Sequence, residues 1–303
     1  MGLYLTFLVF NCSQQTKNDF PILKGPYLGQ KPPGKTPEVF APGIVSTESV
    51  ELNSVFMPDN SELYFTRKTP EALYVIMMMN RKNGLWTKPV PASFSGVYEE
   101  ADPFITSNGK QLLYISKKPL KGLGPPHDIL ILNRNGDEWS KPYNPGLPLN
   151  TEHNEIYPCL TAKGSLYFNS NRPGGYGKRD IYKSEYINGK FSEPENLGGS
   201  ISTEYDEGDI FVPDDESYLI FVSRDRPDSL GSGDLYICFK SKDGKWTVPI
   251  NMGETINAQG YDYGPIVTQD KKYFFYTRNN DIYWVDAKIL DSYKPDELKD
   301  REK

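Results

Sequence analysis

The sequence predicts an all-β chain that folds as a five-bladed β-propeller with four antiparallel strands in each blade. Aromatic residues make up 13% of the chain, and Gly (26) and Pro (25) are both frequent. Aromatic side chains favour strands, whereas Gly and Pro favour turns. Short apolar segments recur throughout the chain, and long segments with helical periodicity are absent until about the last fifteen residues.

The most regular feature is a bulky apolar pair or triplet that ends in Ser or Thr. It occurs at Leu63–Thr66, Leu113–Ser116, Tyr167–Ser170, Ile220–Ser223 and Phe275–Thr277. The hydroxyl residues lie 50, 54, 53 and 54 positions apart. Five matches at nearly constant spacing indicate an internal repeat. Four short strands within each period of about fifty residues are typical of a propeller blade.

Two further landmarks follow, the first in all five units and the second in units one to four. The first is Asp-Ile/Leu-Tyr/Leu, at Asp128–Leu130, Asp180–Tyr182, Asp234–Tyr236 and Asp281–Tyr283, with Ala72–Tyr74 in the first unit. The second is an aromatic residue three positions before a proline, at Trp86/Pro89, Trp139/Pro142, Phe191/Pro194 and Trp246/Pro249. In the third unit, Asn188-Gly189 suits the positive φ angles of a hairpin turn between the third and fourth strands.

The fifth unit contains only three strands, Tyr263–Thr268, Tyr273–Arg278 and Asp281–Val285. Segment Thr36–Ser46, before the first unit, resembles the fourth-strand segments elsewhere. We therefore predict that this N-terminal strand completes blade five and removes the open sheet edges. The alternative of six blades would need about fifty further residues. The predicted propeller covers residues 37–288, and a charged tail covers 289–303.

The N-terminus begins with a short apolar run, Leu3–Phe10, followed by Asn11 and Cys12. Eight residues are too few for a membrane-spanning helix but match the apolar part of a signal peptide. The run resembles a bacterial lipoprotein signal with Cys12 as the acylated residue. Asn11 and the lack of Lys or Arg before the run depart from that pattern. We expect residues 1–12 to be the signal segment, 13–36 a tether, and the protein to be lipid-anchored in a bacterial envelope.

Segment Tyr167–Tyr182 reads Tyr-Phe-Asn-Ser-Asn-Arg-Pro-Gly-Gly-Tyr-Gly-Lys-Arg-Asp-Ile-Tyr. It resembles the PD40, or WD40-like, β-propeller repeat of the TolB C-terminal domain, and the fourth unit matches nearly as well. The resemblance implies the propeller fold, a location in the periplasm or at the cell surface, and binding of a protein or a glycan. It implies no single chemistry, because function depends on sites carried by the fold.

A carboxylate precedes the first strand of every unit: Glu51, Glu100, Glu155, Glu207 and Asp262. The first strand of a blade lines the central channel, so these acids are candidates for a ligand or cation site at its mouth. Alternatively, each acid bonds backbone amides of a neighbouring blade, and its presence in every blade favours this architectural role. Five tyrosines lie beside the acids and are further ligand-binding candidates: Tyr98, Tyr157, Tyr205, Tyr261 and Tyr263. His153 is the histidine expected nearest this mouth.

A basic residue recurs upstream of the Asp-Ile-Tyr aspartate, in the pairs Arg172/Asp180, Arg224/Asp234, Arg278/Asp281 and Lys117/Asp128. These pairs can recognise an anion or form ion pairs within the blade. Their repetition favours the ion pairs, which would orient the loop between strands two and three.

The remaining features restrict the function. A net charge of −6 and a pI near 5.2 exclude nucleic acid as the partner. Three cysteines without a Cys-x-x-Cys spacing and two histidines argue against zinc, and Cys159 and Cys238 are expected to be buried. We expect no cofactor, although channel oxygens would suit Ca²⁺.

The sequence therefore predicts a monomeric, non-catalytic binding or scaffolding propeller whose partner is an envelope protein or a glycan. It would meet the membrane only through its lipid anchor. The alternative is a hydrolase or lyase acting on glycans, with Glu100, Glu155 and Glu207 as candidate acids.

Overall fold

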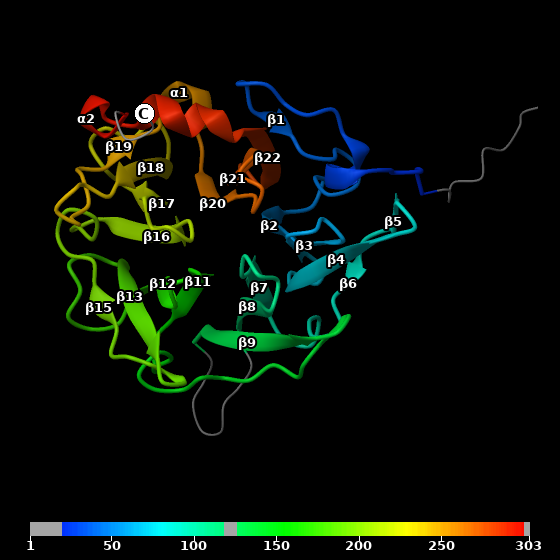
Figure 1. Ribbon diagram of the computed structural model, residues 1–303, viewed down its shortest axis with the longest axis horizontal. Coiled ribbons are helices and arrows are strands. Elements are labelled where there is room, and N and C mark those ends of the chain that lie inside the picture. The colour runs from blue at the N-terminus through cyan, green and yellow to red at the C-terminus, as the bar shows by residue number, and fades with distance from the viewer. Residues whose placement is uncertain (1–19, 118–125, 300–303) are drawn as a thin grey trace, which may run out of the picture.

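The computed structural model describes residues 20–117 and 126–299. They form five antiparallel sheets that follow one another around a central axis (Figure 1). The predicted five-bladed propeller is thereby confirmed.

The blades follow chain order, and their strands are numbered as in Figure 1. Blade one contains β2 (Glu51–Phe56), β3 (Glu62–Lys68), β4 (Tyr74–Lys82), β5 (Leu85–Trp86) and β6 (Val90–Pro91). Blade two contains β7 (Glu100–Ile105), β8 (Gln111–Ser116), β9 (Asp128–Asn135) and β10 (Glu138–Trp139). Blade three contains β11 (Glu155–Leu160), β12 (Ser165–Ser170), β13 (Asp180–Ile187), β14 (Lys190–Phe191) and β15 (Glu195–Asn196). Blade four contains β16 (Asp206–Phe211), β17 (Tyr218–Arg224), β18 (Asp234–Phe239) and β19 (Ile250–Asn251). Blade five contains β20 (Asp262–Val267), β21 (Tyr273–Arg278), β22 (Asp281–Asp286) and β1 (Glu38–Val39).

The first strand of each blade, β2, β7, β11, β16 or β20, lies nearest the axis (Figure 1). The second strands pack between blades and are buried on both faces, so they read as continuous apolar runs. Phe65, Phe168 and Phe221 are fully buried examples. The hydrophobic core therefore forms a ring around the channel.

The outermost strand is short or split where the repeated proline interrupts it. In blade one, β5 and β6 both pair with β4, and in blade three β14 and β15 both pair with β13. Proline has no N–H to donate to the sheet. The hydroxyl before it compensates: Thr87 and Ser192 accept the N–H groups of Asn80 and Glu185, both at 3.0 Å.

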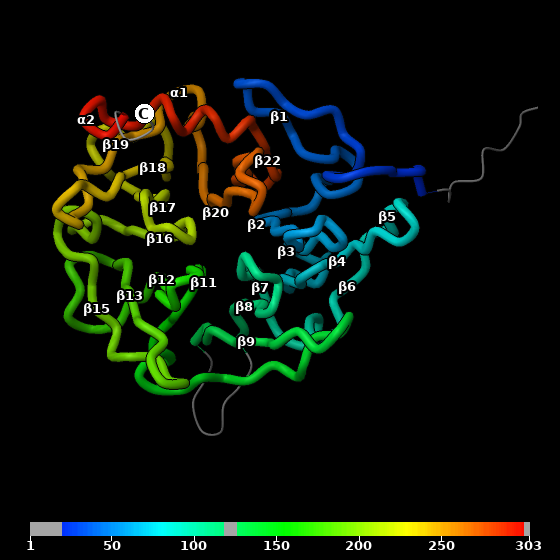
Figure 2. Tube along the Cα trace, in the orientation of Figure 1, coloured from blue at the N-terminus to red at the C-terminus, as the bar shows by residue number. Residues whose placement is uncertain are grey.

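The ring is closed by the N-terminal strand, as predicted. In β1, Glu38 lies opposite Trp284 and Val39 opposite Tyr283 of β22. The next residue, Phe40, is fully buried, and its ring packs edge-to-face on Phe275 and Trp284, both at 5.1 Å. Figure 2 shows the N-terminal strand β1 beside β22 of blade five.

The N-terminal boundary of the domain lies earlier than predicted. Part of the assigned tether, around the 3₁₀ turn η1 (Pro26–Gly29), packs on the propeller. Tyr27 and Leu28 are buried there, and the Trp86 indole donates to the Gly25 carbonyl at 2.7 Å. The signal segment 1–12, with Cys12, lies outside the described residues.

The C-terminal boundary also differs, because the predicted charged tail carries an apolar face. It forms η2 (Ala287–Tyr293) and α2 (Asp296–Lys299). Ile289, Leu290 and Leu298 are buried, and the Tyr293 hydroxyl donates to the Met252 carbonyl beyond β19 at 2.6 Å. A one-turn helix, α1 (Gly253–Ile256), follows β19. None of the helices in the described part of the chain is long and apolar enough to cross a bilayer.

Candidate functional site

The five repeated carboxylates are buried, with at most 3% of each residue exposed. Each accepts the backbone N–H of the residue four positions upstream, at 2.8–2.9 Å. The donors are Thr47, Gly96, Thr151, Thr203 and Ala258. The acids therefore fix the loop that leads into the first strand of each blade.

Four of these carboxylates also bind an arginine at or just beyond the end of strand two. The pairs are Arg67–Glu51, Arg172–Glu155, Arg226–Glu207 and Arg278–Asp262, at 2.7–3.3 Å. In blade two, Ser95 and Ser116 donate to Glu100 instead, at 3.1 and 3.5 Å. Protein donors thus occupy the predicted acid ring, and a ligand would have to displace them. Ligand binding through these five acids stays a prediction.

The basic partners differ from those expected for the Asp-Ile-Tyr aspartates. Arg172 and Arg278 bind the acids before strand one, and Lys117 binds Glu99 at 2.9 Å. Asp180 accepts the N–H groups of Tyr176 and Gly177 instead, at 2.6 and 3.2 Å. The prediction of arginine–aspartate pairs within the blade was therefore wrong. In blades three and four the loop's own amides bind Asp180 and Asp234, and in blade two the Asn144 amide donates to Asp128.

The residues that differ among blades occur two positions after each repeated acid. They are Asn53, Asp102, Tyr157, Asp209 and Gly264, and all have positive φ between 44° and 60°. Each lies where the register between strands one and two shifts, as in a β-bulge. Bulges re-aim a side chain. Here they place five residues of four types at equivalent positions around the channel.

Two of these bulge residues are carboxylates in unusual environments. Burial raises the pKa of Asp209 to about 6, although Arg179, Arg224, and hydrogen bonds from Tyr157 and Gly264 hold it down. Burial and the nearby charge of Asp209 raise the pKa of Asp102 well above its usual value. One oxygen of Asp102 is buried and accepts no hydrogen bond from the described residues. The channel thus contains two neighbouring acids whose pKa values are both raised, so each keeps its proton to a higher pH than a free carboxyl group.

Beside Asp209, blades three to five present an arc of charged and aromatic side chains. Arg179 binds Asp206 through both oxygens, at 2.6 and 3.1 Å. Arg224 lies 3.6 Å from Asp206 and donates to the Tyr261 hydroxyl. Its guanidinium lies over the Tyr261 ring at 4.4 Å. We call Arg179, Asp206, Arg224 and Tyr261 the arginine–tyrosine arc.

A second network continues around blades two and three. Glu99 accepts from Lys117 at 2.9 Å and contacts His127 Nε2 at 3.1 Å. His127 Nδ1 in turn contacts the Asn154 amide oxygen at 3.1 Å. Burial opposes ionisation of Glu99, but the hydrogen bonds from Lys117 and His127 lower its pKa overall. His127, rather than His153, therefore belongs to this network; His153 lies 3.9 Å from the exposed Glu152.

The five predicted tyrosines occupy different environments. Tyr157 is a bulge residue, and Tyr261 belongs to the arginine–tyrosine arc. Tyr263 is buried and stacks on Tyr261 at 4.3 Å. Tyr98 and Tyr205 are half-buried beside Glu100 and Glu207. Tyrosine does not mark one common position, and only Tyr157, Tyr261 and Tyr263 lie beside Asp209.

Sequence reasoning missed Asp102, Arg179, Asp206 and Asp209. The signal that could have identified them is a change of residue type, from blade to blade, at a fixed position of the repeat. Arg179 directly precedes Asp-Ile-Tyr, Asp206 directly precedes a repeated acid, and the two bulge carboxylates lie two positions after one. Other blades carry different residues at these positions, so their role is not simply to support the blade.

No group of three or more His, Cys, Asp or Glu side chains is placed to hold a metal within residues 20–117 and 126–299. The suggested Ca²⁺ in the channel therefore stays a prediction. Cys159 and Cys238 are buried and unbridged, as expected. Burial raises the pKa of Cys159 to about 12.

Comparison with known proteins places the chain by fold. No family model matches, and no curated protein matches. Among solved structures, the BT0996 protein in its RGII complex is 11% identical with a TM-score of 0.52, and the match covers 86% of this protein and 91% of BT0996. The tricorn protease is 12% identical with a TM-score of 0.51, and the match covers 80% of this protein and 26% of the protease.

TolB from Acinetobacter baumannii is 12% identical with a TM-score of 0.49, and the match covers 80% of this protein and 55% of TolB. The chain thus spans about half of that TolB and a quarter of the tricorn protease. At these identities the likeness is one of fold: the chain is a five-bladed β-propeller, and its structural neighbours include TolB.

Proposed function

We propose that the chain is a binding propeller of the bacterial envelope that holds a carboxylate-bearing segment of a protein or glycan at the channel mouth. The arginine–tyrosine arc carries this proposal. Arg179 and Arg224 share one carboxylate, Asp206, so these three groups carry one net positive charge, which ionised Asp209 offsets above about pH 6. About a third of the Arg224 side chain is exposed. Arginine suits planar, bidentate recognition of carboxylates.

Burial of the channel acids favours binding over catalysis. Asp102 and Asp209 are only 3% and 1% exposed, below the arc. The channel beyond the bulges is nearly filled by residues such as Phe104, Ile210 and Ile266, which leave a void of about 10 Å³. A void of that size holds about one water molecule. Within the described residues, a ligand at the mouth would therefore meet this packed layer beyond the bulges.

The test uses immobilised protein to capture ligands from envelope extract and from acidic polysaccharide. We expect Arg224→Gln and Tyr261→Ala to reduce retention at least about tenfold, because a few central Arg and aromatic residues dominate binding. Tyr205→Ala tests a second residue of the predicted tyrosine set and should also weaken retention. Lys163→Gln is the matched control, because Lys163 lies in the turn after β11 and contacts the Asp215 carbonyl. Unchanged retention by Arg224→Gln and Tyr261→Ala would contradict the proposal.

The second candidate function is hydrolysis of a glycan, favoured by the coupled acids Asp102 and Asp209. Unlike pKa values in a carboxylate pair are typical of general acid–base chemistry. A panel of chromogenic aryl glycosides provides the test. Release of the chromophore by the native chain but not by Asp209→Asn would support an enzyme. No release from any glycoside would leave binding as the function.

The envelope location depends on Cys12. An acylated Cys12 would anchor the propeller at a membrane surface. Packing on the propeller already includes Phe20, and the Leu23 carbonyl accepts the Trp86 N–H at 3.1 Å. The segment available as a tether is therefore shorter than residues 13–36.

A further inference from the structure

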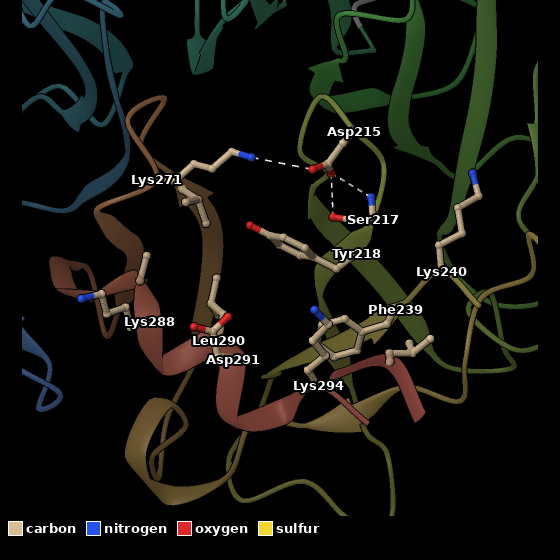
Figure 3. Close-up of a pocket in the computed structure, with 13 residues that line it drawn as sticks. Asp215, Ser217, Tyr218, Phe239, Lys240, Lys271, Lys288, Leu290, Asp291 and Lys294 are labelled. Carbon is tan, nitrogen blue, oxygen red and sulfur yellow. Dashed lines mark hydrogen bonds and ion pairs between the residues drawn. The ribbon is translucent and has the colours of Figure 1, made fainter. Parts of the chain in front are cut away.

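A second groove lies between blades four and five, apart from the channel. Figure 3 shows it between the start of β17, the turn after β20 and the C-terminal segment of η2 and α2. It encloses about 350 Å³. That volume is at the lower end of the range for small-molecule sites.

The walls of the groove are largely apolar. Val267, Ala287, Leu290 and Leu298 line it, together with the rings of Tyr218 and Phe239. The two rings lie 6.2 Å apart between centroids. Such a lining accommodates a compact apolar body, and contact with it removes apolar surface from water.

A single hydroxyl is directed into this apolar space. Figure 3 shows the Tyr218 hydroxyl pointing into the groove, where it forms no hydrogen bond with any described residue. Burial, together with the charges of Asp215 and Asp291, raises the pKa of Tyr218. The hydroxyl therefore remains protonated near neutral pH and is available as a donor.

Ammonium groups surround the same space. Lys271 is paired with Asp215 at 3.7 Å, and Lys240 with Glu216 at 3.3 Å. Lys294 extends toward the groove in Figure 3 and forms no ion pair within the described residues. The lining carries four lysines, including Lys288, against the two aspartates Asp215 and Asp291, and this net positive charge together with the Tyr218 hydroxyl suits a carboxylate.

We propose that this groove binds a small organic monocarboxylate with an aromatic or branched apolar body. The apolar part packs against Leu290, Leu298 and Phe239. The carboxylate accepts hydrogen bonds from the Tyr218 hydroxyl and the Lys294 ammonium. The site is independent of the arginine–tyrosine arc.

Phenylacetate is the probe, titrated into the full chain by isothermal calorimetry. We expect saturable binding, with Tyr218→Phe and Lys294→Gln each weakening it about tenfold, as for a hydrogen bond to a charged group. Phenylacetamide and acetate should bind at least about tenfold more weakly, because each lacks one of the two recognised features. Lys245→Gln is the matched control, since that lysine is 83% exposed and pairs with Asp243.

Binding unchanged in both Tyr218→Phe and Lys294→Gln would overturn the proposal. Equal binding of phenylacetamide, or no saturable binding of phenylacetate to the native chain, would overturn it as well. Arg224→Gln should bind phenylacetate normally. This keeps the result separate from the outcome at the channel mouth.

Discussion

At the scale of single residues, the polar groups fall into two classes: those repeated in every blade and those found in one or two blades only. The repeated acids each accept a backbone amide four positions upstream, and in four blades an arginine as well. Burying a charge is costly unless it is paired and hydrogen-bonded. Once the buried charge is paired, removing either partner destabilises the fold. The recurring carboxylates therefore support the blades.

Glu155→Ala should lower the free energy of unfolding by about 3–5 kcal/mol, because it leaves Arg172, whose side chain is only 11% exposed, without its partner. Urea denaturation measures the effect. Glu152→Ala is the matched control, since that side chain is 75% exposed and should change stability by less than about 0.5 kcal/mol. Equal stability of the two variants would show that the acid has no structural role.

Asp209 makes stability depend on pH in a defined direction. Its pKa in the folded chain is about 6, above the usual 3.8. Its favourable contribution to the free energy of unfolding is fully present below about pH 4 and is lost as the pH rises through 6. Asp209→Asn stays neutral, so it should gain stability relative to the native chain between pH 4 and 8, by up to about 3 kcal/mol. Parallel stability curves for the two proteins across this range would contradict the raised pKa.

At the scale of elements, the two-residue strand β1 contributes more than its length suggests. Its pairing with β22 completes the sheet of blade five, and Phe40 beside it joins an aromatic cluster with Phe56, Phe275 and Trp284. Such ring pairs add stability beyond their buried area. Closure of the ring therefore depends on the Phe40 side chain as well as on the backbone pairing of β1 with β22.

Phe40→Ala should cost about 3–5 kcal/mol of unfolding free energy, as for other fully buried phenylalanines. Thermal and urea unfolding both report this loss. Ile22→Ala is the control, because Ile22 is 79% exposed. A cost for Phe40→Ala no larger than that of the control would mean that the N-terminal segment does not hold the ring closed.

At the scale of the whole molecule, the first and last described segments of the chain are both joined to the ring. The N-terminal segment is anchored at blade five by β1 and at blade one by Trp86 and Gly25. The C-terminal segment runs from blade five to blade four through Tyr293 and Met252. An anchor at Cys12 would therefore hold the whole propeller through a short tether.

The lipid anchor predicts that Cys12 carries fatty acid when the full sequence is made in a Gram-negative host. Metabolic labelling with an alkyne fatty acid should mark the native chain and Cys159→Ser, but not Cys12→Ser. Cys159 is buried and serves as the matched control. Label that persists in Cys12→Ser, or a native chain without label, would show that the N-terminal resemblance is misleading.

The fold was predictable because its evidence is repeated. Five matches to one pattern, each ending in a buried hydroxyl such as Thr66 or Ser223, establish the blades. Because unit five lacks a fourth strand, the sequence also predicted that an N-terminal strand, β1, fills that position. The domain boundaries were less predictable, because Tyr27, Leu28 and Leu298 are a few apolar residues in otherwise polar segments and their burial depends on distant blades.

The sequence by itself determined the five blades, their order and the strand that closes the ring, since strand periodicity and turn residues act locally and recur. Only the tertiary structure decided which polar residues meet. The bulges place Asp102 and Asp209 in one channel although they are far apart in the chain, and Arg179 of blade three meets Asp206 of blade four. Such meetings depend on packing between blades, which no local pattern encodes.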